Sequence, residues 1–203
     1  DFGEVVLGYQ STVGFYATNE GMGALVVEDL ELSADTSIDF RLISDDVERI
    51  DPGESAELMV RYIPGEVGQD YGNLLLVSDD GENPEASVRL EAFGVEPLID
   101  VEPTILWYGV VAQGETTTQS FEISARGTGS LKITDIRFGS DEAEAFSVEL
   151  PSGVELPYTM ASGLSLSVDV HFMANDEQSW DGSLIIQTND PTTPESSVQL
   201  LAN

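Results

Sequence analysis

The residues with catalytic potential are few, because the chain has one histidine and no cysteine among its 203 residues. His171 follows Asp169 by two positions, and a triad of the Ser-His-Asp type needs a histidine held between a nucleophile and an acid. No Gly-x-Ser-x-Gly sequence accompanies this pair, and the alternating pattern around it places both side chains on the outward face of a strand. We therefore expect a surface histidine, no catalytic residues, and neither disulfides nor thiolate zinc sites.

Carboxylates are abundant, and two acidic turns are candidates for cation binding. One turn contains Asp79, Asp80, Glu82 and Asn83, and the other contains Asp141, Glu142 and Glu144. Calcium prefers oxygen ligands of these types, although neither turn has the spacing of an EF-hand loop. The first turn is the candidate for weakly bound calcium, with a solvated acidic turn as the alternative. No other cofactor is expected.

Two tryptophans, Trp107 and Trp180, are candidates for binding a partner. Exposed indole rings stack on sugars or become buried in a protein interface. Both tryptophans lie in the second half of a duplicated chain, opposite Asp1 and Asp70 of the first half. Local packing near the junction of the halves is the alternative for Trp107.

The elements that position these residues are duplicated. At an offset of 106 residues Gly21, Gly23 and Leu25 meet Gly127, Gly129 and Leu131, and at an offset of 110 the match continues to the end of the chain. The second stretch of the match pairs Leu58, Val60, Tyr62, Leu74, Leu76 and Leu90 with Val168, Val170, Phe172, Leu184, Ile186 and Leu200. Apolar alternation and turn glycines are repeated, whereas almost no polar side chain that could do chemistry is kept in both halves.

Alternation with a period of two residues predicts an all-β chain. In one half Leu58, Val60 and Tyr62 alternate with polar residues, and Asx, glycine and proline turns separate such segments. About seven short strands in each half predict two tandem immunoglobulin-like β-sandwich domains, over residues 1–97 and 98–203. Phe15 and Phe121 are expected to be equivalent inward-facing core residues.

Two details of the strand pattern go beyond the fold class. The inward positions slip by one residue near Glu28–Asp29 and near Thr134–Asp135, which predicts a β-bulge at the same place in each half. The second half also begins with an extended segment, residues 98–105, that has no counterpart in the first half. The first sandwich is therefore expected to lack its first strand, and the resulting open edge invites a strand from elsewhere.

The charge excludes several classes of partner. The chain has 38 acidic residues and a net charge of −31; residues 1–97 contain 22 acidic and 4 basic groups, and residues 98–203 contain 16 and 3. Such a surface repels phosphate backbones and anionic lipids, so neither nucleic-acid binding nor membrane insertion is expected. The acidity is typical of proteins that work in high salt, and a composition bias of the source lineage is the alternative.

Several turn and strand motifs recur in the two halves. The first half has Asn19-x-Gly-x-Gly-x-Leu25, Asp51-Pro-Gly-Glu-Ser55, Gly72-x-Leu-x-Leu76 and Leu90-x-Ala-x-Gly94, and the second has Gly182-x-Leu-x-Ile186 and Thr188-Asn-Asp-Pro-x-x-Pro194. These motifs resemble those of the Hydin-type immunoglobulin-like modules, the ASH or choice-of-anchor D-like group. The second half departs from the pattern at Ala125, Ser162 and Ala174.

The resemblance implies a non-catalytic module in a secreted or cell-surface bacterial protein, as a stalk, spacer, adhesive segment or filament unit. Its partners would be other proteins or copies of itself. A module that binds glycans or a protein ligand within a larger secreted protein, and a ciliary or centrosomal scaffold, are the alternatives.

Overall fold

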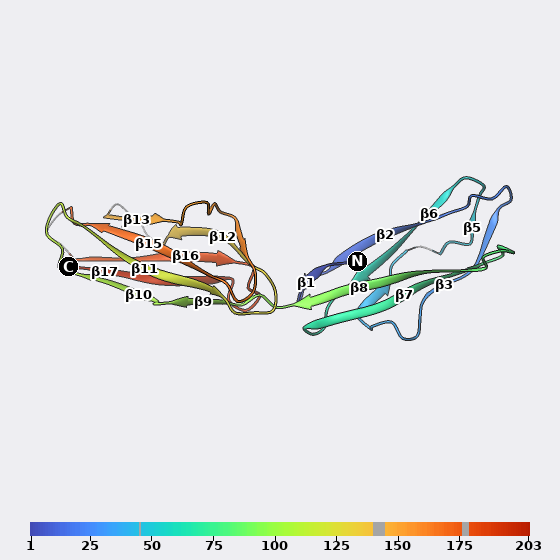
Figure 1. Cartoon of the computed structure of the whole chain (residues 1–203), viewed down its shortest axis with the longest axis horizontal. Coiled ribbons are helices and arrows are strands. Elements are labelled where there is room, and N and C mark those ends of the chain that lie inside the picture. Colours follow the sequence, from blue (N-terminus) through green and yellow to red (C-terminus); the bar gives the residue numbers. More distant parts are fainter. Residues whose placement is uncertain (45, 140–144, 176–178) are drawn as a thin grey trace. The chain divides into compact units, whose positions relative to one another are not determined.

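The computed structural model describes residues 1–44, 46–139, 145–175 and 179–203 and divides the chain into two compact units (Figure 1). The first unit comprises Asp1–Val95 and the second Glu96–Asn203. Each unit is an immunoglobulin-like β-sandwich, as predicted, and strands are its main elements within the described residues. In the described part of the chain no helix is long and apolar enough to cross a membrane.

The first unit has one sheet in the order β1-β8-β7-β3-β5 and another in the order β2-β6-β4. Strand β1 runs parallel to β8, and the other pairs in this unit are antiparallel. The strands of this unit are β1 (Glu4–Val6), β2 (Ser11–Thr18), β3 (Leu25–Leu32), β4 (Phe40–Leu42), β5 (Arg49–Ile50), β6 (Ser55–Tyr62), β7 (Gly68–Ser78) and β8 (Glu85–Val95).

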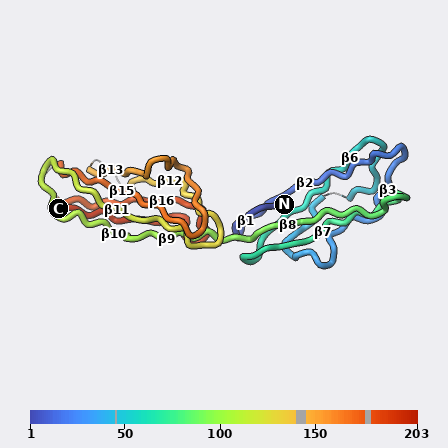
Figure 2. The backbone as a smooth tube through the Cα atoms, viewed as in Figure 1, coloured from blue at the N-terminus to red at the C-terminus, as the bar shows by residue number. Residues whose placement is uncertain are grey.

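The second unit repeats this order and adds one strand. Its sheets are β10-β17-β16-β12-β14 and β13-β15-β11-β9, and the tube in Figure 2 follows the chain through both units. The strands are β9 (Ile99–Glu102), β10 (Ile105–Gly109), β11 (Thr116–Ala125), β12 (Leu131–Phe138), β13 (Phe146–Glu149), β14 (Tyr158–Met160), β15 (Ser165–Met173), β16 (Trp180–Thr188) and β17 (Glu195–Ala202).

Each core is centred on three aromatic rings at equivalent positions. Phe2, Phe40 and Tyr62 meet in the first unit with centroid distances of 4.9 to 6.0 Å. Their counterparts in the second unit are Tyr108, Phe146 and Phe172, at 5.0 to 5.7 Å. Strand alternation explains this burial, because every second side chain of a strand faces the opposite sheet.

The predicted bulges are confirmed. The pairing of β3 with β7 shifts register between Val27 and Asp29, and that of β12 with β16 shifts between Ile133 and Asp135. The turns also match, since Gly3 and Gly109 both have φ of 67°, a conformation that favours glycine. The duplication therefore extends to the irregular features of the backbone.

The two units differ at one sheet edge. Strand β11 pairs with both β15 and β9, whereas β2 pairs only with β6, so β9 has no counterpart within the described first unit. Phe121 is 1 % exposed, but Phe15, although inward-facing as predicted, is only partly buried. The expectation that the two rings are equally buried was wrong, because β9 covers this edge in the second unit only.

Candidate functional site

His171 lies on the outward face of the sheet formed by β13, β15, β11 and β9. Its Nδ1 is 2.7 Å from Thr118 Oγ1, and its Nε2 is 3.1 Å from Glu149 Oε2. Ser120 donates a hydrogen bond of 2.7 Å to Asp169 on the same face. These contacts fix the imidazole between a hydroxyl and a carboxylate, but a sheet face does not enclose a substrate as a catalytic pocket does. We assign the group a cross-strand packing role.

The acidic turn of the first unit uses its carboxylates to hold its own backbone. Asp79 Oδ1 accepts a hydrogen bond of 2.8 Å from the Val26 N–H. Asp80 Oδ1 accepts from Glu82 N–H at 2.9 Å and from Asn83 N–H at 3.2 Å. Within the residues that the structure describes, no group of three or more acidic, histidine or cysteine side chains could hold a metal ion. Calcium binding here stays a prediction, and Asp141, Glu142 and Glu144 of the second candidate turn lie outside the described residues.

The equivalent turn of the second unit anchors a strand. Asp190 is 2 % exposed, and its Oδ1 accepts hydrogen bonds of 2.8 Å from the N–H groups of Thr192 and Thr193. Its Oδ2 accepts one of 2.8 Å from Ile99 N–H, at the first residue of β9. Burial opposes ionisation of Asp190, but the hydrogen bonds from Ile99, Thr193 and Thr192 outweigh it and lower the pKa of this carboxyl. The ionised carboxylate therefore fixes the start of β9.

A hollow of about 410 Å³ lies beside the acidic turn of the first unit. The lining residues belong to the end of β2, the glycine-rich loop, the start of β3 and the acidic turn: Thr18, Asn19, Glu20, Gly21, Gly23, Ala24, Leu25, Asp79 and Asp80. The Asn19 side chain holds the loop through hydrogen bonds to Gly23 O at 2.8 Å and Ile50 O at 2.9 Å. The hollow is therefore a preformed feature of the first unit.

Trp107 is the exposed tryptophan. Its side chain is 56 % exposed on the edge strand β10, and Ile105, two residues earlier on the same face, is 51 % exposed. On this face the neighbouring strands β17 and β16 line a polar hollow of about 390 Å³ with Asp181, Gly182, Ser183, Ser197 and Gln199. Gln199 is the cross-strand partner of Ile105. The exposed indole ring is therefore on the same sheet face as amide, hydroxyl and carboxylate groups.

Trp180 has a different environment. Its ring is partly buried against the core of the second unit, with its centroid 6.3 Å from that of Phe172 in an edge-to-face arrangement. Its Nε1 is buried and makes no hydrogen bond with the described residues. Trp180 therefore packs in the core, and the prediction of a binding tryptophan depends on Trp107.

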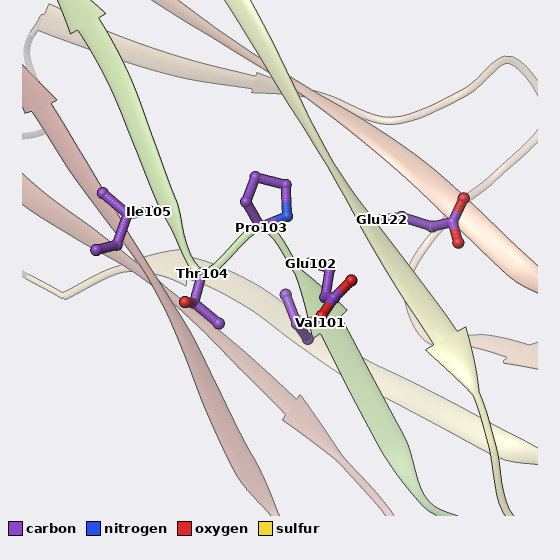
Figure 3. Close-up of a pocket in the computed structure, with 6 residues that line it drawn as sticks. All are labelled: Val101, Glu102, Pro103, Thr104, Ile105 and Glu122. Atoms are coloured by element: carbon purple, nitrogen blue, oxygen red, sulfur yellow. The ribbon is translucent and has the colours of Figure 1, made fainter.

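A third hollow, of about 710 Å³, lies where the chain crosses from β9 to β10 (Figure 3). Pro103 and Thr104 make this crossing, which carries the chain from one sheet of the sandwich to the other. Glu102 and Glu122 border the hollow as exposed cross-strand neighbours. Two like charges at such a position disfavour each other. Five of the six lining residues, 101–105, belong to the crossing and the strand ends beside it, so we interpret this hollow as a consequence of the crossing.

Comparison with known proteins finds similar solved structures but assigns no family. No family model matches the sequence, and no curated protein matches it. A protein of unknown function from Porphyromonas gingivalis W83 has 20 % identity and a TM-score of 0.45, covering 98 % of this chain and 93 % of its own. PapD-like domain 7 of human CEP192 has 15 % identity and a TM-score of 0.41, with 52 % and 83 % covered.

Secreted proteases also occur among these structures. The Vibrio cholerae VesB protease has 15 % identity and a TM-score of 0.40, covering 90 % of this chain and 62 % of its own. Likenesses at these scores say nothing about activity. The β-sandwich assignment follows from the strand order and the two cores of the chain itself.

Proposed function

We propose that this chain is a non-catalytic structural module of a secreted or cell-surface bacterial protein, in which the two sandwiches act as a stalk or spacer. The observation that carries the proposal is that the features shared by the units are internal: the two aromatic trios, the two bulges and the turn glycines. The only histidine of the sequence is not shared, since His171 of β15 corresponds to Arg61 of β6. Duplication that maintains only the scaffold favours a role in which length and stability matter.

The surface chemistry supports the same proposal. A net charge of −31 on 203 residues keeps copies of the module apart and soluble. The resemblance to Hydin-type modules of bacterial surface proteins points in the same direction, and protein partners or self-assembly would follow from that setting.

A replacement experiment tests the spacer role. In the full-length protein, residues 1–203 are exchanged for two unrelated β-sandwich domains of equal length, and in a second strain they are deleted. A spacer predicts that the exchange restores surface display and attachment of the remaining domains, whereas the deletion does not. Failure of the exchange, with the protein displayed at normal levels, would show that the surface of this module itself is required.

A second candidate function is glycan or protein binding by the Trp107 face. The exposed ring beside the polar hollow of Asp181, Ser183 and Gln199 favours it, because sugar recognition combines aromatic stacking with hydrogen bonds. A glycan array and calorimetry with purified chain would test this function. Trp107→Ala is expected to abolish any specific signal, while Tyr9→Ala, at a tyrosine that is 64 % exposed in the first unit, leaves it unchanged. Equal signals from both variants would reject this face as a binding site.

A further inference from the structure

The second unit shows how a sandwich of this chain holds its first strand. Strand β9 pairs antiparallel with the end of β11, from Ala125 opposite Ile99 to Glu122 opposite Glu102. The segment that leads into β9 is held by the glycine-rich loop, because Arg126 N–H donates to Leu98 O and Thr128 N–H donates to Glu96 O, both at 2.9 Å. The Asp190 bond to Ile99 N–H completes these contacts.

The hollow of the first unit is lined by the counterparts of these residues. Thr18, Glu20 and Gly21 correspond to Ser124, Arg126 and Gly127, and Asp79 and Asp80 correspond to Asn189 and Asp190. Asp80 Oδ1 holds its turn as Asp190 Oδ1 does, but Asp80 Oδ2 accepts no hydrogen bond from the part of the chain that the structure describes. Asp190 Oδ2 accepts the hydrogen bond from Ile99 N–H in the second unit. Its counterpart in the first unit, Asp80 Oδ2, is therefore available to accept a hydrogen bond from an added strand.

The backbone of β2 is also available. Asn19 N–H donates inward to Glu54 O, at 3.0 Å. Since the N–H groups of an antiparallel strand point alternately to its two sides, those of Tyr16, Thr18 and Glu20 face the open edge. Their counterparts in the second unit face β9. Side-chain contacts differ in two places. The fully exposed Met22 replaces Thr128, whose Oγ1 accepts from Glu96 N–H. Glu20 replaces Arg126, whose Nε donates to Asp100 Oδ2 of β9 at 3.2 Å.

The apolar face of the edge is left partly uncovered. Phe15 and Ala17 are only partly buried, while their counterparts Phe121 and Ile123 are 1 % and 0 % exposed. In the second unit Val101 of β9 is 8 % exposed and belongs to the core. An added strand with apolar residues at alternate positions would cover Phe15 and Ala17 in the same way.

A glycine supports this interpretation. A Cβ on Gly127 would lie 1.9 Å from Glu96 O and 2.5 Å from Leu98 N, so the segment before β9 requires glycine there. Gly21 occupies the equivalent position, where the nearest neighbour of an added Cβ is the Asn19 side chain at 3.0 Å. The first unit thus has the close-approach glycine without a segment that approaches it in the structure.

We propose that the edge of β2, with the hollow at Asp80 and Gly21, is a receptor groove for an extended peptide strand from outside residues 1–203. The occupant runs antiparallel to β2 with the chemistry of Leu98–Glu102: apolar side chains at the two inward positions and a free N–H that donates to Asp80 Oδ2. With 22 acidic and 4 basic groups in residues 1–97, the groove favours a strand that is neutral or basic at its outward positions. This proposal is independent of the spacer role, because a groove of this kind recognises backbone and alternate side chains.

A graft tests the groove in the full chain. The sequence of residues 96–106 is placed directly before Asp1, with the residues copied from Asp100 and Glu102 changed to asparagine and glutamine so that the outward positions are neutral. This reproduces the connection of the second unit, because Asp1 corresponds to Trp107. A covalently attached strand has a high effective concentration, so even weak docking becomes visible. We expect hydrogen exchange at Tyr16, Thr18 and Glu20 to slow by about tenfold or more, and the first unit to melt at a higher temperature.

Three controls make the graft decisive. A graft in which the residues copied from Ile99 and Val101 are changed to serine is expected to give no protection. Asp80→Asn keeps the oxygen that holds the turn and is expected to weaken protection by about tenfold, the value of one charged hydrogen bond. Glu82→Gln in the same turn is expected to leave it unchanged.

Two results would overturn the proposal. The first is that the apolar graft leaves exchange at Tyr16, Thr18 and Glu20 as fast as in the chain without a graft. The second is that the chain without a graft already protects these amides in a concentration-dependent dimer, since a second copy would then fill the edge. A synthetic peptide of residues 96–106 that slows exchange at the same amides when added in trans would support the proposal for a separate strand.

Discussion

Each aromatic trio has one hydroxyl group, and the two units differ in which of the three rings carries it. In the first unit it belongs to Tyr62 and donates to Asp70 at 2.6 Å, and in the second it belongs to Tyr108 and donates to Val170 O at 2.9 Å. Burial raises the pKa of both tyrosines, and for Tyr62 the hydrogen bond to Asp70 raises the pKa further. Each trio therefore keeps one buried hydroxyl in its neutral form with a defined partner.

Alkaline pH is expected to destabilise the first unit through Tyr62. The folded pKa is above the unfolded value of 10.0, so the associated stability is fully present below pH 10 and is lost as the pH rises through the folded pKa. Denaturant melts of Tyr62→Phe, which places at this position the residue found in the second unit, should show a flatter pH dependence than the original chain above pH 10. Tyr9→Phe, at an exposed ring, serves as the control; an identical loss in the original chain and Tyr62→Phe would contradict the prediction.

The phenylalanines at the β2 and β11 positions are expected to differ in their effect on stability. Phe121→Ala should cost about 3 to 5 kcal/mol in the second unit because the ring is fully buried. Phe15→Ala should cost about 1 to 2 kcal/mol, because the open edge already exposes part of the ring. Urea unfolding with the two units monitored separately by NMR measures both values. Equal costs would indicate that the edge of β2 is covered in solution.

At the scale of elements, strand β9 and the turns that hold it distinguish the two sandwiches. In the second unit the glycine-rich loop is held by the segment before β9, through Leu98 O and Glu96 O. In the first unit the Asn19 side chain supports the equivalent loop, and Ala125 stands at its place in the second unit. The absence of this asparagine at Ala125 thus coincides with the presence of a strand whose lead-in segment holds the same loop.

The substitutions Gly127→Ala and Gly21→Ala are expected to destabilise their units by different amounts. Gly127→Ala should destabilise the second unit by about 1 to 3 kcal/mol, because its Cβ would clash with the backbone of Glu96 and Leu98. Gly21→Ala should cost less, since the only close neighbour is the Asn19 side chain. Thermal melts of both variants give the comparison. A larger loss for Gly21→Ala would mean that the loop of the first unit is held more tightly than its contacts indicate.

At the scale of the whole molecule, charge is the dominant property. Only a few exposed ion pairs, such as Arg49 with Asp51 and Arg137 with Glu195, offset the acidic groups of the described surface. Exposed pairs of this kind contribute little to stability. The repulsion among the remaining carboxylates is therefore a net cost to the folded state.

Added salt is expected to stabilise the chain. Screening shortens the range of repulsion from about 10 Å at 0.1 M to about 3 Å at 1 M salt. The folded state is stabilised more than the unfolded state, because its carboxylates lie closer together. The melting temperature should rise between low and near-molar sodium chloride, with potassium chloride as the control for a specific ion effect. A constant melting temperature over this range would contradict the high-salt interpretation of the composition. A further rise with millimolar calcium that Asp80→Asn removes would support a cation at the acidic turn.

The sequence by itself determined the β-sandwich class, the duplication, the bulges near Asp29 and Asp135, and the extended segment of residues 98–105 that has no counterpart within residues 1–97. Each of these depends on local alternation and turn chemistry, which a linear pattern records. Only the tertiary structure decided the burial of Phe15, the packing of Trp180 and the role of Asp190, because these depend on which distant segment covers a side chain. By sequence Asp80 is one carboxylate in an acidic turn. Only the structure shows that its counterpart, Asp190, holds Ile99, a contact between residues 91 positions apart in the chain.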